Sequence, residues 1–168
     1  LVGFRAFKKI LPNDTHVAVF DTAFHQTMEP EDYIFPVPKE FTEKYDCRRY
    51  GAHGTSHKFL AEKGVDYLPG VAHPRIISCH IGSGASITAI KDGKCVATSM
   101  GLTPLGGIMM GTITGDMDPS VFNYVCTVTG KSAEEVYQMF NKKSGYLGVS
   151  QLSNDSRDIN DACDKGHK

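Results

Sequence analysis

An aspartate directly follows a short apolar run near the start of the chain. The run His16–Phe20 is rich in valine and is typical of a buried strand, and Asp21 comes immediately after it. Open α/β sheets bind ligands at the carboxyl ends of their strands, so a carboxylate here is placed to hold a metal ion or orient a nucleophile. The alternative, from spacing alone, is a turn aspartate that hydrogen-bonds to the nearby backbone.

A histidine among glycines is the second candidate. His53 lies within Gly51–Gly54, where small neighbours let other groups approach its ring closely. Thr55 caps a predicted helix that runs to about Gly64, and the free N–H groups at a helix start attract anions. This position suits a histidine that stabilises a phosphoryl group, although simple packing in a turn explains His53 equally well. We interpret His57 as a residue of the helix surface.

A glycine-containing turn joins two predicted strands, Arg75–His80 and Ala85–Lys91. Backbone N–H groups in such a turn can cradle phosphates. It is not a Walker loop, because the GK[ST] element is missing and no helix follows directly. A plain hairpin turn is therefore the alternative interpretation. The turn consists of His80, Ile81, Gly82, Ser83 and Gly84.

Two further polar groups lie toward the end of the chain. Asp116 and Asp118 have the hard oxygen atoms that Mg²⁺ prefers, but Asp118 is also the predicted cap of a helix. The second group begins a helix and is placed to meet a nucleotide, with an exposed ion-paired helix start as the alternative. Its members are Asp155, Ser156 and Arg157.

Composition narrows the class of protein. The chain has 168 residues, 40% of them hydrophobic, which is enough to build the core of one domain. The net charge of -1 gives no electrostatic reason to expect a nucleic-acid partner. Five cysteines without a CxxC pair argue against a disulfide framework and a structural zinc site, and favour a cytoplasmic protein. No apolar run approaches the about 18 residues that span a bilayer, so no membrane partner is expected.

The pattern predicts strands early and helices late, as in a sheet covered by helices. The dipeptide Asp92-Gly93 is the strongest hairpin signal, and joins the strand ending at Lys91 to one over Lys94–Thr98. Residues 99–118 are expected to form an ordered functional loop. Both ends of the chain fall within or just after helical patterns, so we expect a piece of a longer protein. The remaining predicted helices cover residues 2–10, 39–45, 119–129 and 132–143, with a last one from about Asn154.

Four blocks occur together in the chain. They are Val19–Met28 (VFDTAFHQTM), Arg49–His57 (RYGAHGTSH), Thr98–Leu105 (TSMGLTPL) and Asn141–Gly145 (NKKSG). In order and spacing they closely resemble the acetate kinase family, over essentially the whole chain. The resemblance implies an α/β fragment of the acetate and sugar kinase/Hsp70/actin-type (RNase H-like) fold, with a mixed sheet and flanking helices. Residues 1–70 would end the first α/β half, and residues 71–168 would begin the second, nucleotide-binding half.

The resemblance also implies an activity and a set of roles. The activity is the reversible transfer of the ATP γ-phosphoryl group to acetate, with Mg²⁺, in a homodimer. Asp21 matches the catalytic aspartate and His53 the histidine that stabilises the transferring group. The turn His80–Gly84 matches the phosphate-binding segment, and Asp155–Arg157 a nucleotide-binding segment. Ala52 and Pro104 match the walls of the small acyl pocket, and no residue of this chain is assigned as a metal ligand.

Some positions depart from the family pattern. Ile113 stands where the family has an arginine that stabilises charge in the transition state, and isoleucine has no donor for that purpose. Ser83 replaces the usual asparagine but can still donate a hydrogen bond. Gly106 stands where glutamate is usual, and Ala97 where aspartate is usual.

Two hypotheses follow from these residues. The first is a working carboxylate kinase, favoured by Asp21, His53 and the glycine pattern. The second is a non-catalytic homologue or inactive fragment with a structural or partner-binding role, favoured by Ile113. A propionate or butyrate kinase is a close relative of the first hypothesis, and the pocket residues are compatible with it.

Overall fold

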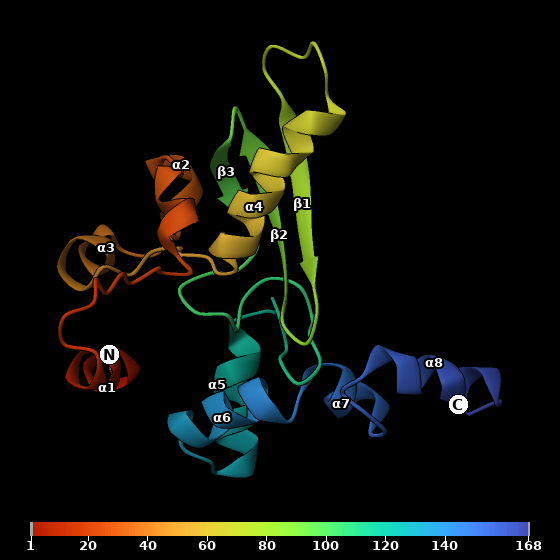
Figure 1. The fold of residues 1–168 in the computed structure, drawn as a ribbon. Coiled ribbons are helices and arrows are strands. Elements are labelled where there is room, and N and C mark those ends of the chain that lie inside the picture. The colour runs from red at the N-terminus through yellow and green to blue at the C-terminus, as the bar shows by residue number, and fades with distance from the viewer. Residues whose placement is uncertain (1, 168) are drawn as a thin grey trace.

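A three-stranded antiparallel sheet organises the molecule (Figure 1), whose computed structural model describes residues 2–167. The strands are β1 (Arg75–Ile81), β2 (Ala85–Lys91) and β3 (Lys94–Thr98), in that order across the sheet. The β2–β3 turn has positive φ at both Asp92 (52°) and Gly93 (75°), as a type I′ turn requires. The hairpin predicted from Asp92-Gly93 is therefore confirmed.

Helices account for most of the remaining regular structure. The helix predicted over Lys39–Tyr45 is confirmed with those bounds, and α6 has the predicted capping box between Ser132 and Glu135. Gly130 ends α5 in the left-handed region, at φ 67°. The α-helices are α1 (Val2–Ile10), α2 (Pro30–Tyr33), α3 (Lys39–Tyr45), α4 (Gly54–Gly64), α5 (Ser120–Thr129), α6 (Ala133–Lys142), α7 (Gly145–Ser150) and α8 (Ser156–Asp164), and the 3₁₀ helices are η1 (Ala23–Thr27) and η2 (Val65–Tyr67).

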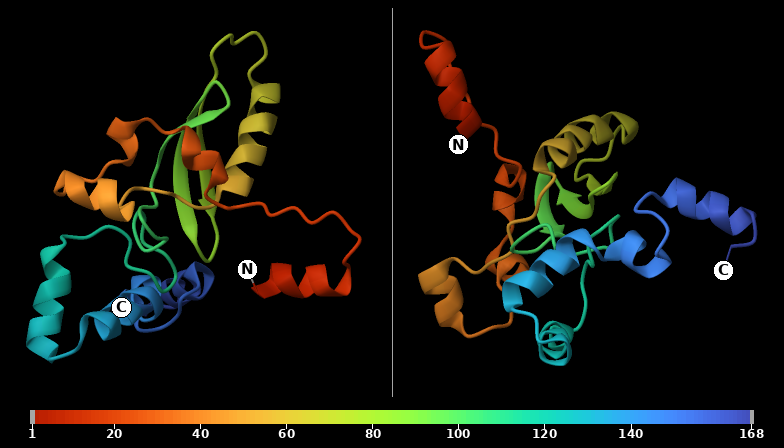
Figure 2. Two further views of the ribbon diagram at one scale, coloured as in Figure 1. Left: turned by 90° about the vertical axis from the view of Figure 1, so that its left-hand side faces the viewer. Right: turned by 90° about the horizontal axis from the view of Figure 1, so that it is seen from below.

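The packing of these elements creates one layered region and several projecting ones. Helix α4 lies against β1, and η1 packs against both α4 and β3. Helix α5 packs against α6 below the sheet, while α1 and α8 project on opposite sides (Figure 2). The turn between β1 and β2 points toward α7 and α8 (Figure 1). None of the helices within residues 2–167 is long and apolar enough to cross a membrane.

A small apolar cluster joins the start of β2 to the long segment that follows β3. Ala52, Ala85, Met100 and Met110 are all buried and in contact, and Ile113 packs against them half-buried. The long irregular segment that contains Met100 and Met110 is anchored by this contact.

Two predictions about strands are wrong. Residues 16–20 are not a strand, because no neighbouring strand within residues 2–167 completes a ladder with them. The apolar side chains of Val17, Val19 and Phe20 are consequently 76%, 75% and 63% exposed. The described sheet is also purely antiparallel rather than mixed.

The predictions for α4 also need correction. The helix begins at Gly54 with His53 as its N-cap, so Thr55 is not the cap. Phe59 is 58% exposed, and the face that packs inward contains His57 and Ala61. The face of α4 that meets the sheet therefore presents small and polar residues. His57, predicted to lie on the surface, is fully buried.

Other differences between the predicted and observed elements concern a short helix and two helix starts. The short helix α2 lies between η1 and α3, in a stretch that contains three prolines, Pro30, Pro36 and Pro38. Helix α5 begins at Ser120, and Asp118 still acts at its start, accepting a hydrogen bond at Oδ1 from the Ser120 N–H (2.8 Å). Helix α8 begins at Ser156, with the Asp155 side chain as its cap.

Candidate active site

The structure brings Asp21 and His53 together at the start of α4. The backbone N–H of His53 donates to Asp21 Oδ2 (3.1 Å), and the N–H of Gly54 donates to the Asp21 carbonyl oxygen (2.8 Å). Asp21 therefore satisfies two N–H groups that a helix start leaves free. Glycine is required at position 54, because a Cβ there would overlap the Asp21 carbonyl oxygen.

The imidazole of His53 is held between the glycine turn and the sheet. His53 has φ 86°, in the left-handed region that a residue other than glycine adopts only under tertiary constraint. Its ring stacks on that of His80, with centroids 4.1 Å apart, and its Nδ1 lies 2.9 Å from Ser86 Oγ. A Cβ at Gly84 would lie 3.3 Å from both Cε1 and Nε2 of His53. The Nε2 edge of the ring therefore faces the glycine turn.

Three histidines in this region favour the neutral form. Burial lowers the pKa of His53, and the neighbouring His80 lowers it further. Burial, together with repulsion from His25 and His53, lowers the pKa of His57 to about 4. Burial also lowers the pKa of His25, whose Nε2 lies 3.0 Å from the Ala52 carbonyl oxygen. The cluster is thus neutral at pH 7 and offers hydrogen bonds rather than fixed charge.

Sequence reasoning missed the residues that support His53 from behind. Ser86 and His57 are fully buried and hydrogen-bonded to each other, and Ser78 bonds to the far side of the His57 ring. The available signal was the strand pattern of β2, where the alternate residues Ser86 and Thr88 are polar yet face inward. Polar residues on a buried strand face must be paired, and so indicate a hydrogen-bonded network.

A cleft of about 470 Å³ brings together the glycine turn and the start of α8, two of the predicted binding segments. Ser83 belongs to one wall, and Tyr146 and Asp155 to others. Its lining residues are Ile81, Gly82, Ser83, Tyr146, Asn154, Asp155, Ser156 and Arg157. The remaining turn residues, His80 and Gly84, lie instead against His53.

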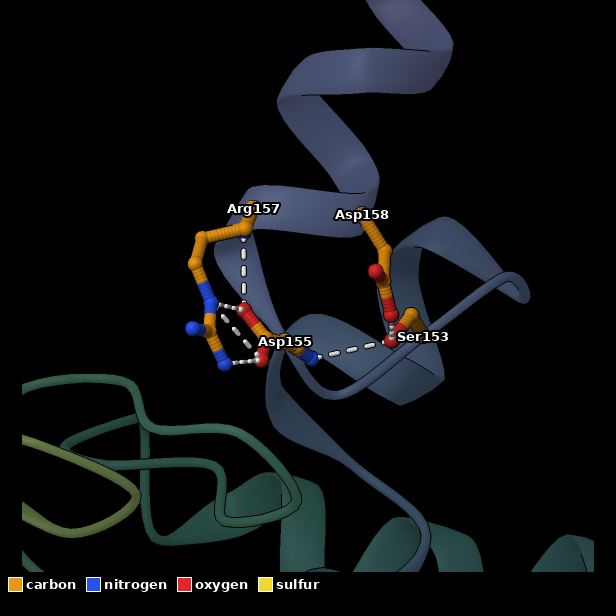
Figure 3. A network of polar contacts seen from close by, with 4 residues as sticks. All are labelled: Ser153, Asp155, Arg157 and Asp158. Carbon is orange, nitrogen blue, oxygen red and sulfur yellow. Dashed lines mark hydrogen bonds and ion pairs between the residues drawn. The ribbon is translucent and has the colours of Figure 1, made fainter.

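The wall of this cleft at α8 is held by charged hydrogen bonds (Figure 3). The Asp155 carboxylate accepts hydrogen bonds from the backbone N–H of Arg157 (2.9 Å) and from its guanidinium Nε (3.0 Å). These bonds lower the pKa of Asp155 to about 2. On the other side, the hydroxyl of Ser153 donates to Asp158 Oδ2 (2.7 Å) and accepts from the Asp155 N–H (3.0 Å). The Arg157 side chain remains 87% exposed beside the cleft.

The two residues predicted to wall the acyl pocket, Ala52 and Pro104, do not lie in one cluster. Ala52 is buried next to His53 and shares its apolar cluster with Ile113. Pro104 is exposed and lies outside that cluster. A separate cavity of about 380 Å³ is lined by its neighbours Thr103 and Leu105 but not by Pro104 itself.

The aspartates considered for Mg²⁺ have other partners. Asp116 Oδ1 accepts a hydrogen bond from the Gly107 N–H (2.8 Å), and Asp118 Oδ1 accepts one from the Ser120 N–H at the start of α5 (2.8 Å). Across residues 2–167, no group of three or more histidine, cysteine, aspartate or glutamate side chains is arranged to hold a metal ion.

Two solved structures that share this fold are kinases of small carboxylic acids. The chain matches a propionate kinase from Francisella tularensis subsp. tularensis SCHU S4 with a TM-score of 0.93 and 46% identity, over 98% of this chain and 42% of that one. It matches the acetate kinase of Porphyromonas gingivalis with a TM-score of 0.92 and 45% identity, over the same shares of the two chains.

Sequence comparison narrows this class to one family. The model of the acetokinase family matches residues 1–168, and the chain therefore belongs to that family. It is 50% identical to the acetate kinase of Bacillus subtilis (strain 168) over an alignment of 169 residues that covers 100% of this chain and 43% of that protein. It is also 50% identical to the acetate kinase of Macrococcus caseolyticus (strain JCSC5402) over 167 residues, 99% of this chain and 42% of that one. The chain thus spans less than half the length of these relatives.

Proposed function

We propose that the natural protein containing this chain, at whatever length the cell makes it, is an ATP-dependent carboxylate kinase. It transfers the γ-phosphoryl group of ATP to acetate, giving acetyl phosphate and ADP, and also runs in reverse. One observation carries the proposal: the Asp21 carboxylate binds the backbone N–H of His53 at a helix start, and the His53 imidazole lies directly beside the glycine turn. Family membership supports the same reaction.

In this proposal His53 stabilises the phosphoryl group during transfer. Phosphoryl transfer depends mainly on positioning and on stabilising the charge spread over the equatorial oxygens. The Nε2 edge of His53 faces Gly84, so a phosphoryl group lying against the turn would meet a ring nitrogen. Asp21 positions His53 through the backbone N–H and presents a carboxylate next to the reacting groups.

The cleft between the turn and α8 is the proposed nucleotide site. Its volume of about 470 Å³ is within the range of small-molecule sites. The backbone N–H of Ser83 would bind a phosphate oxygen, whereas that of Gly82 donates within the turn to the Gly84 carbonyl oxygen (3.0 Å). The start of α8 at Asp155–Arg157 would contact the nucleoside. Mg²⁺ would bind to the ATP phosphates, where it keeps several waters and takes few protein ligands. Asp21 fits beside such an ion, because it is exposed and only its Oδ2 is hydrogen-bonded within residues 2–167.

The acid substrate needs no strong base, because a carboxylic acid is already ionised at neutral pH. We place its acyl group against Ala52, and assign Pro104 to the opposite wall on the family pattern. Propionate is a second candidate substrate, favoured by the match to a propionate kinase at a TM-score of 0.93. Assembly as a homodimer, a cytoplasmic location, and the division into half-domains at residues 70 and 71 belong to this proposal.

A non-catalytic role is the alternative, and Ile113 favours it. Its side chain packs on the apolar cluster that contains Ala52, and it has no donor for a phosphoryl oxygen. A protein with this residue that binds nucleotide without turnover would fit the alternative.

The experiment is a steady-state assay of the natural protein with ATP, Mg²⁺ and acetate or propionate, followed by ADP release. The proposal predicts acid-dependent turnover that Asp21→Asn removes and that Asp14→Asn, an exposed aspartate in a nearby turn, leaves intact. Absence of turnover with both acids, while ATP still binds, would replace the kinase with the non-catalytic alternative.

A further inference from the structure

A continuous line of hydrogen-bonding side chains runs from the sheet to the Nδ1 atom of His53. Ser78 Oγ lies 2.9 Å from His57 Nδ1, and His57 Nε2 lies 2.8 Å from Ser86 Oγ. Ser86 Oγ then lies 2.9 Å from His53 Nδ1. His57 and Ser86 are completely buried, and Ser78 is 4% exposed. Three buried side chains that cannot contact a substrate are therefore hydrogen-bonded in series to His53, which can.

The sheet register explains why these groups meet. Ser78 on β1 pairs with Thr88 on β2, and Ser86 lies two residues from Thr88 on the same face of β2. The two serine hydroxyls therefore face α4, which packs on β1. The His57 ring from α4 lies between them and bonds to both.

Proton counting allows only two arrangements of this line. A serine hydroxyl has one proton, so Ser86 donates to one ring nitrogen and accepts from the other. A neutral imidazole likewise has one N–H and one acceptor nitrogen. In the first arrangement Ser86 donates to His53 Nδ1, which leaves the proton of His53 on Nε2. In the second, His53 donates from Nδ1, and its Nε2 is a bare acceptor.

Ser78 selects the first arrangement. Its hydroxyl is buried, and His57 Nδ1 is its one hydrogen-bond partner within residues 2–167. In the first arrangement Ser78 donates to that nitrogen, so every proton of the line has an acceptor. In the second, His57 Nδ1 is already protonated, and the Ser78 proton is left buried without an acceptor. Such an unpaired buried donor is unfavourable.

We propose that Ser78, His57 and Ser86 form a directed hydrogen-bond chain that holds His53 as the neutral Nε2–H tautomer, with its N–H aimed at the glycine turn. Ser86 is the positioning residue that contacts His53, and Ser78 sets the direction of the chain. The catalytic consequence rests on the proposed kinase function: an Nε2–H donates to a phosphoryl oxygen, whereas a bare nitrogen would repel it.

The functional test compares three deletions of buried hydroxyls in the natural protein. Ser86→Ala removes the donor to His53, and Ser78→Ala removes the group that directs the chain without touching His53. Thr88→Val is the matched control, since Thr88 is also fully buried on β2 but bonds to Thr98 Oγ1 (2.9 Å) instead of a histidine. We expect kcat to fall about tenfold in Ser86→Ala, to fall less in Ser78→Ala, and to stay within about twofold in Thr88→Val, with the KM values for ATP and acetate within about twofold throughout.

A spectroscopic readout tests the tautomer without relying on activity. In solid-state ¹⁵N spectra of the histidine-labelled wild-type protein, with His53→Gln for assignment, His53 should show a protonated Nε2 and a bare Nδ1. A protonated Nδ1 in the wild type overturns the proposal, as does an equal loss of kcat in Thr88→Val and Ser86→Ala. If Ser86→Ala does not fold, the kcat of Ser78→Ala and the wild-type spectrum still test the proposed tautomer of His53. If the wild type is inactive but shows the Nε2–H tautomer, the proposed kinase function is wrong and the proposed hydrogen-bond chain is retained.

Discussion

Gly84→Ala tests whether the close approach of the turn to His53 matters for turnover. The φ of Gly84 lies outside the left-handed region, so alanine introduces no backbone strain there. The new Cβ would lie 3.3 Å from Cε1 and Nε2 of His53, closer than the about 3.5–4.0 Å at which carbon atoms pack best. The ring must therefore move by a few tenths of an ångström. A misplacement of 1 Å can cost about a hundredfold in rate, so we expect kcat to fall by roughly tenfold or slightly less.

The assay is steady-state phosphorylation of acetate by the natural protein, with two further variants for comparison. Gly3→Ala on α1 controls for the substitution itself, because a Cβ there meets no atom within 4 Å. At Gly82 the nearest atom to an added Cβ, the Gly84 carbonyl oxygen, would be at an ordinary 3.5 Å. Gly82 lines the cleft, so Gly82→Ala should raise the KM for ATP more than it lowers kcat. An unchanged kcat in Gly84→Ala, or an equal loss in Gly3→Ala, would refute this reasoning.

Further predictions concern the histidines, position 113 and the isolated chain. His53→Ala should lower kcat by about a hundred- to a thousandfold and weaken ATP binding less; an unchanged kcat would make His53 merely structural. Ile113→Arg should raise kcat by up to about a thousandfold, with a smaller effect on KM, because it restores a donor for the transferring group; equal kinetics of the two proteins would mean that another residue supplies the charge. Burial lowers the pKa of His57 from 6.5 to about 4, so the unfolded state binds this proton more tightly. The stability gained by keeping His57 neutral is therefore complete above pH 6.5 and is lost as the pH falls toward 4, by up to about 3 kcal/mol. Thermal melting of the natural protein and of His57→Gln across this range checks it: the variant should lack this part of the pH dependence. The purified 168-residue chain alone should have no kinase turnover, because it spans only 42% of its relatives; turnover that Asp21→Ala abolishes would contradict this.

Local signals in the sequence predicted most of the regular structure. The Asp92-Gly93 turn and the Ser132–Glu135 capping box are each determined by a few adjacent residues, and both were predicted correctly. The start of α4 was not, because its cap is tertiary: Asp21, far away in the chain, binds the N–H groups of His53 and Gly54.

The candidate site was only partly predictable for a similar reason. Motifs identify Asp21, His53 and the turn His80–Gly84, and the structure brings them side by side. The supporting residue His57 was wrongly predicted to lie on the helix surface, because a histidine on a helix has no periodic signal of burial. Its burial becomes evident only when the register of β1 and β2 brings two serine hydroxyls to its ring.

The most direct test of the central claim is ATP formation from ADP and acetyl phosphate by the natural protein, compared with the same protein carrying Asp21→Asn. Asp21 is exposed and holds the start of α4 through two backbone hydrogen bonds, one of them through its carbonyl oxygen, which the substitution retains. We predict ATP formation that depends on acetyl phosphate in the wild type and is lost in the variant, while the melting temperatures of the two proteins remain similar. Equal rates of ATP formation in both proteins, or none in the wild type, would contradict the assignment of this site to phosphoryl transfer.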